Sequence, residues 1–82
     1  MNDQKIVIIV EELCELEADQ SIPRNVRMRI KNAITALNDS EKQTEVKVDR
    51  ALEELSYADS DPNLQQYTRT QIWTVVSALE AR

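Results

Sequence analysis

Residues 6–16 read IVIIVEELCEL, and their apolar residues recur every three or four positions. At about 100° per residue, this spacing gathers several apolar side chains on one face of a helix. Glu11, Glu12 and Glu15 fall on the other side, so we predict an amphipathic helix from about Asp3 to Glu17. The inward set is Ile6, Ile9, Val10, Leu13 and Leu16. The apolar run at residues 6–10 is far too short to cross a membrane.

Three further segments show the same helical periodicity. The second is expected to open near Pro23 and the third at a capping box of Ser40 with Gln43. The start of the fourth stays open: Asp61 could cap it, or Thr68 with Gln71 could form a second capping box. The predicted inward residues are Val26, Ile30, Ala33, Ile34, Leu37, Val48, Ala51, Leu52, Leu55, Ala58, Ile72, Val75, Val76 and Leu79.

A shift of 42 residues aligns the first half of the chain with the second. Leu13 then meets Leu55, and Ile30 meets Ile72. We interpret this as two similar helical hairpins, distantly similar to HEAT repeats; the alternative is that any two amphipathic hairpins of this composition align loosely. Two repeats are too few for a solenoid. We therefore expect one all-α domain over residues 1–82, closed as an up-and-down four-helix bundle.

Two stretches carry a resemblance to a known family. Residues 21–27 read SIPRNVR, and a DPN turn at residues 61–63 is followed by TRTQIW at residues 68–73. Together they resemble an archaeal family of short acidic proteins that is classed as uncharacterised. The resemblance implies a four-helix bundle, similar in layout to the bromodomain arrangement, in an archaeal cytoplasm. It implies no activity and carries over no catalytic residue.

The amino-acid composition limits the kinds of catalytic and metal site that the chain can form. The chain lacks His and Gly, carries a net charge of −5 and has a single cysteine, Cys14. Without His, histidine metal ligation and histidine base catalysis are excluded. Cys14 cannot form an internal disulfide, which fits a reducing cytosol, and we expect it to be buried beside Val10. We predict no catalytic residue, metal site or cofactor, and no enzyme activity.

The turns carry a repeated pair of charges. Asp19 is followed eight residues later by Arg27, and Asp61 by Arg69. One interpretation is structural: each aspartate accepts hydrogen bonds from helix amides or from the arginine and ties the hairpins together. The other is two unrelated charges at each place, since most surface ions contribute little.

The second helix carries the densest basic group, formed by Arg24, Arg27, Arg29 and Lys31. It could contact phosphate or RNA. The simpler interpretation is a solvated face that pairs with acids of neighbouring helices. The aromatic residues that single-strand binders interleave with their cations are missing from this helix.

Several apolar residues fall outside the predicted core stripes: Ile8, Met28, Val46, Tyr57 and Trp73. Several together suggest an interface, although Trp73 could also lie at the edge of the core. The specific role stays unknown from sequence. We predict a non-catalytic helical interaction module that forms a homodimer or binds a cytosolic protein; the alternative is a small RNA- or phosphate-binding adaptor.

Overall fold

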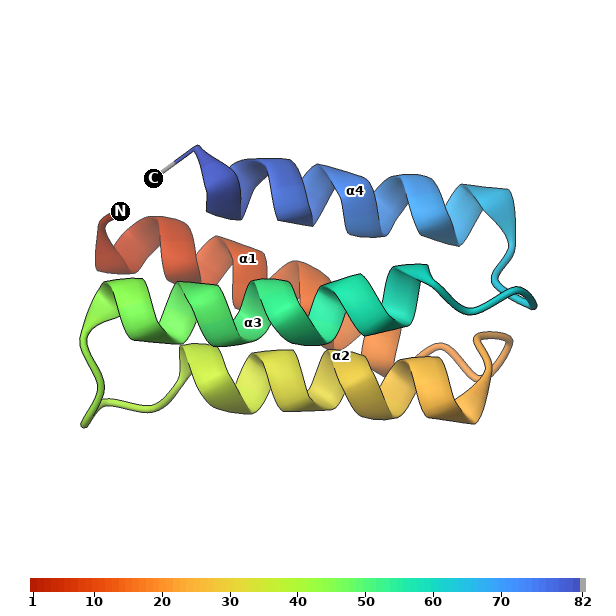
Figure 1. The fold of residues 1–82 in the computed structure, drawn as a ribbon, viewed down its shortest axis with the longest axis horizontal. Helices are drawn as coiled ribbons and strands as arrows, with labels where there is room; N and C mark the ends of the chain where they lie inside the picture. The colour runs from red at the N-terminus through yellow and green to blue at the C-terminus, as the bar shows by residue number, and fades with distance from the viewer. Residues whose placement is uncertain (82) are drawn as a thin grey trace.

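The computed structural model describes residues 1–81, which form four α-helices. They are α1 (Asp3–Glu17), α2 (Arg24–Leu37), α3 (Thr44–Asp59) and α4 (Gln66–Glu80). Each helix runs antiparallel to the one before it, so the start and the end of the chain lie at the same end of the molecule (Figure 1). The all-helical prediction is confirmed, and α1 has the predicted bounds.

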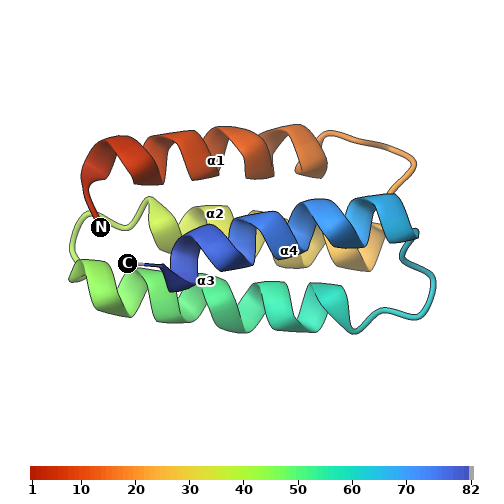
Figure 2. The same cartoon turned by 90° about the horizontal axis from the view of Figure 1, so that it is seen from above.

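The helices pack in a closed ring. Contacts join α1 to α2, α2 to α3, α3 to α4 and α4 back to α1 (Figure 2). The contact between α2 and α3 is the most extensive, and the contact between α1 and α4 is the least. No contact between diagonal helices occurs in the described residues, which is the packing of a four-helix bundle.

The core is formed by one apolar stripe from each helix. All the predicted inward residues are buried except Val10, Ile34, Leu52 and Val76, which are partly buried and pack against the core. The 42-residue shift pairs Val10 with Leu52 and Ile34 with Val76. Residues at matching positions of the two hairpins are therefore buried to a similar degree. The buried apolar set is Ile6, Ile9, Leu13, Leu16, Ile22, Val26, Ile30, Ala33, Leu37, Val48, Ala51, Leu55, Ala58, Leu64, Ile72, Val75 and Leu79.

The predicted starts of α3 and α4 are wrong. Helix α3 begins at Thr44, and Gln43 takes the N-cap position without a side-chain hydrogen bond, so Ser40 and Gln43 form no capping box. Helix α4 begins at Gln66, and its N-cap residue makes no side-chain hydrogen bond either. Thr68 lies inside α4 and is buried, because its position corresponds to Val26 under the repeat. The helix-two expectation holds more closely: Pro23 directly precedes α2.

The prediction that Cys14 is buried is also wrong, because its side chain is exposed. Leu13 occupies the core position of that helical turn and is fully buried. The next residue is rotated by about 100° around the helix, which carries its side chain away from the core.

We expect Leu13→Ala or Ile30→Ala to lower the free energy of unfolding by about 2–5 kcal/mol, because each leaves a cavity where a fully buried side chain was. Val46→Ala is the control, since Val46 is 41% exposed, and its effect should stay within about 0.5 kcal/mol. Urea denaturation followed by circular dichroism measures both. Equal losses for core and control variants would contradict this core.

Candidate functional site

The three inter-helix turns share one backbone geometry. Each contains an aspartate two residues past the end of a helix, whose Oδ1 accepts a hydrogen bond from the amide two residues further on. The distances are 2.9 Å for Asp19 with Ser21, 3.0 Å for Asp39 with Glu41, and 2.8 Å for Asp61 with Asn63. In each turn the aspartate carbonyl also accepts from the amide three residues on, and the next helix starts five residues on. This Asx turn explains how three helices begin without side-chain caps.

The aspartates of the first and third turns, Asp19 and Asp61, were singled out from the sequence, and Asp39 of the middle turn was not. The 42-residue shift superimposes the first turn on the third, and Asp39 lies 20 residues after Asp19 and 22 before Asp61. An aspartate two or three residues beyond each apolar stripe is the signal that identifies all three.

The arginines that follow two of these aspartates do bind the turns, but through backbone carbonyls. Arg27 donates from Nε to the carbonyl of Ile22 at 3.0 Å. Arg69 donates from Nη2 to the carbonyl of Asp61 at 3.1 Å. It also donates to both the carbonyl and the carboxylate of Asp59, and its ion pair is therefore with Asp59 at 3.1 Å. The carboxylate of Asp61 instead accepts from the side-chain amide of Asn25, which links the two hairpins.

The carboxylate of Asp19 is stabilised in its charged form. The Ser21 hydroxyl donates to it at 2.7 Å, the Ser21 amide donates as well, and the positive charge of Arg27 adds a smaller effect. Together these lower the pKa of Asp19 below its ordinary value. A lowered folded-state pKa means that this carboxylate stabilises the turn near neutral pH and loses its contribution as the pH falls through that pKa.

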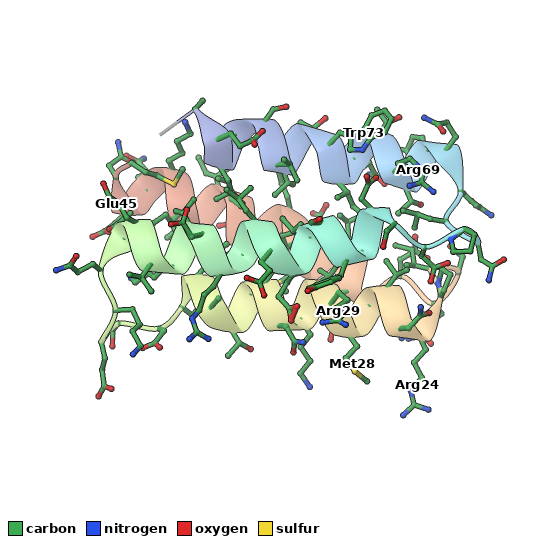
Figure 3. All side chains as sticks on the ribbon, viewed as in Figure 1. Arg24, Met28, Arg29, Glu45, Arg69 and Trp73 are labelled. Atoms are coloured by element: carbon green, nitrogen blue, oxygen red, sulfur yellow. The ribbon has the colours of Figure 1, made fainter. Side chains whose placement is uncertain are left out.

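Trp73 is held at the seam between α3 and α4. Its Nε1 donates a hydrogen bond to Oδ1 of Asp59 at 2.7 Å. The same oxygen also accepts a hydrogen bond from Arg69. Figure 3 shows Trp73 and Arg69 close together on α4. The ring is 47% exposed, so one edge is anchored while the rest faces outward.

A second anchored aromatic lies at the seam between α2 and α3. The guanidinium of Arg29 lies over the ring of Tyr57, 4.4 Å from its centre, and forms an ion pair with Glu54 at 3.0 Å. Asn32 donates to the same carboxylate at 2.9 Å. Tyr57 and Arg29 therefore have contacts within the chain.

These contacts divide the predicted basic group. Arg27 and Arg29 are partly buried and bond to other residues of the chain, whereas Arg24 and Lys31 are exposed. Arg24 and Met28 project away from the bundle on α2 (Figure 3). Arg24, Met28 and Lys31 line an open hollow together with Glu17 of α1. Anion binding by the four predicted cations stays a prediction.

All five predicted apolar outliers are largely exposed. Seven large apolar side chains have this status in the described residues, because Val7 and Tyr67 join the predicted set. The sequence signal for Val7 is its place in the IVIIV run, about 100° around the helix from Ile6. The exposed set is Val7, Ile8, Met28, Val46, Tyr57, Tyr67 and Trp73.

Residues 1–81 match the model of the Uncharacterised protein family (UPF0147). The chain belongs to this family. A UPF0147 protein of Aeropyrum pernix is 35% identical over 79 residues, covering 96% of this chain and 87% of that protein. One from Pyrococcus furiosus is 38% identical over 79 residues, covering 95% and 85%. The resemblance to an archaeal uncharacterised family is thereby confirmed.

A solved structure shares this fold. It is the crystal structure of the unknown function protein MMP1188, with 36% sequence identity and a TM-score of 0.95, covering 100% of this chain and 93% of that one. The four-helix architecture of this UPF0147 chain is therefore one that a crystal structure also shows.

Among residues 1–81, no Cys, Asp and Glu side chains gather in a group that could hold a metal ion. No helix in this part of the chain is long and apolar enough to cross a membrane.

We expect Arg69→Ala to lower the free energy of unfolding by about 2–3 kcal/mol, because it leaves the Asp59 carboxylate and two carbonyls without a charged donor. Arg29→Ala is the matched control. Its side chain is 43% exposed in a surface ion pair, so the loss should stay below about 1 kcal/mol. Urea denaturation measures both, and the reverse order of the two losses would contradict the role assigned to Arg69.

Proposed function

We propose that this domain is a non-catalytic interaction module that self-associates, most simply as a homodimer. One observation carries the proposal: seven large apolar side chains are exposed on a domain whose core is already closed. Single exposed apolar residues are ordinary on soluble proteins. Several on so small a surface are typical of a protein that buries them against a partner.

The size of the chain supports the same proposal. A domain of about this length buries only about 60–65% of its unfolded surface, so its core is thin. Association adds buried apolar area without lengthening the chain. Val7 and Met28, each more than half exposed, are aliphatic side chains that gain by such burial.

The alternative, a phosphate- or RNA-binding adaptor, has less support. Of its four cations, Arg27 and Arg29 already have partners within the chain. Only Arg24 and Lys31 are left on the outside, on a chain with a net charge of −5. Two exposed cations make a weak electrostatic footprint for a nucleic acid.

The origin of the bundle is part of the proposal. We infer that it arose by duplication of one helical hairpin, distantly similar to a HEAT repeat and closed in a bromodomain-like layout. The matching turns at Asp19 and Asp61, and the matching half-buried positions, support the duplication.

Sedimentation over a wide range of protein concentration tests the proposal. We expect the average mass to rise from that of one chain toward that of two, following a single monomer–dimer equilibrium. A strict monomer at the highest concentration would contradict self-association. A gel shift with cellular RNA that is abolished by Arg24→Glu with Lys31→Glu would favour the alternative instead.

A further inference from the structure

Building on the proposed self-association, we infer that the partner is a second copy, and that the two copies meet through the outer face formed by α1 and α2. In this dimer α1 of each copy lies across α2 of the other. The inference rests on the opposite charges of the two helices and on the apolar stripe between them. It also rests on the twofold symmetry that brings opposite charges together.

The first observation is a separation of charge between neighbouring helices. Helix α1 carries five acidic side chains and one lysine, whereas α2 carries four basic side chains and no acidic one. The two net charges are equal in size and opposite in sign. The other two helices offer no such pair, because α3 mixes both signs and α4 carries only Arg69 and Glu80.

Much of this charge has no ion-pair partner among the residues that the structure describes. Among residues 1–81, Arg29 pairs with Glu54 of α3, and no residue of α1 pairs with one of α2. Glu11, Arg24 and Lys31 are exposed and belong to none of the ion pairs. A surface of this kind is complementary to a second copy of itself.

The second observation is an apolar stripe on the α2 side of α1. Val7, Val10, Cys14 and Glu17 are three or four residues apart, so they share one side of α1. Glu17 marks that side as the one next to α2, because it lines a hollow with Met28 and its basic neighbours. Val7 is 53% exposed and Val10 is partly buried.

Met28 continues this stripe on α2. It is 55% exposed and lies between Arg24 and Lys31 at helical spacing. The α1–α2 face therefore has apolar side chains along its middle, with Glu11 on the outer side of α1 and Arg24 and Lys31 on α2. Glu12 and Glu15 lie on the other side of α1, where they line a hollow with α4. An apolar centre with a charged rim is the usual composition of a protein interface.

Symmetry decides how two such faces meet. Most small homo-oligomers are twofold dimers with self-complementary surfaces. A twofold axis across the helices places α1 on the partner's α1, with acids against acids. An axis parallel to the helices places α1 on the partner's α2, with acids against bases, and charge selects this arrangement.

The relative positions of residues along α1 and α2 then determine which acidic residue faces which basic residue of the partner. Helices α1 and α2 are antiparallel (Figure 1), and Glu17, the last residue of α1, lines the same hollow as Arg24, the first residue of α2. Glu11 is six residues back along α1, and Lys31 is seven residues on along α2. Glu11 therefore faces the partner's Lys31, and the twofold axis creates this contact twice.

The size of the face is sufficient for a modest dimer. The molecule extends over 33 × 21 × 18 Å, so a face along its length covers about 600–700 Å². A standard interface covers about 800 Å² on each partner. We therefore expect a reversible dimer that weakens as salt screens the charges.

Two charge-reversal variants test the pairing. Glu11→Lys carries Lys at positions 11 and 31, and Lys31→Glu carries Glu at both. Each variant homodimer therefore places like charges against each other in both of its contacts between position 11 and the partner's position 31. We expect each variant alone to raise the dimer dissociation constant about tenfold or more. An equimolar mixture of the two should dimerise again, because both contacts of the mixed dimer join opposite charges.

Matched controls come from α3. Glu53→Lys and Arg50→Glu make the same charge changes at exposed positions outside the α1–α2 face, and neither should raise the dissociation constant as strongly. Circular dichroism is used to check that all four variants fold. Sedimentation of each variant and of the mixtures gives the masses.

The outcomes separate this inference from the proposed function. A wild-type chain that stays monomeric at all concentrations overturns both. A wild-type dimer whose mass is unaffected by Glu11→Lys and Lys31→Glu overturns the α1–α2 interface alone. Weakened variants that do not recover on mixing overturn the twofold pairing of Glu11 with the partner's Lys31.

Discussion

Burial of one apolar stripe from each of four helices along a common axis is the constraint on which the rest of this structure depends. Two helices packed only against each other would leave part of each apolar stripe exposed to water. Four antiparallel helices joined by short turns close the ring, and Leu13, Ile30, Leu55 and Ile72 become fully buried. Everything outside the stripes is then left on the surface, where charge and exposed apolar groups determine what the domain can bind.

The sequence predicted those features that depend on periodicity alone. The bounds of α1 and the inward residues follow from the helical repeat of apolar side chains. The partly buried core residues also fall in pairs under the 42-residue shift. Helix starts were harder, because they depend on Asx turns and on arginines that reach back to turn carbonyls. The burial of Ile22 and Leu64 depends on the path of the turns, which periodicity within a helix does not describe.

Five of the seven exposed apolar residues were predicted from the sequence, and their contacts were not. Residues opposite a core stripe must be exposed, so Ile8, Met28 and Val46 could be named from sequence. That Tyr57 packs on Arg29 and Trp73 bonds to Asp59 depends on the spacing between helices, which only coordinates give. These contacts separate cations that hold the bundle from those left outside it, and the outer charges on α1 and α2 are what a second copy would recognise.

Amide nitrogen–proton correlation spectra at low and high protein concentration test self-association through the α1–α2 face most directly. Dimerisation there shifts the signals of Val7, Glu11, Cys14, Met28 and Lys31 as concentration rises, while signals on the outer faces of α3 and α4 stay in place. Spectra that do not change with concentration, or changes confined to α3 and α4, would contradict the structure-based interpretation.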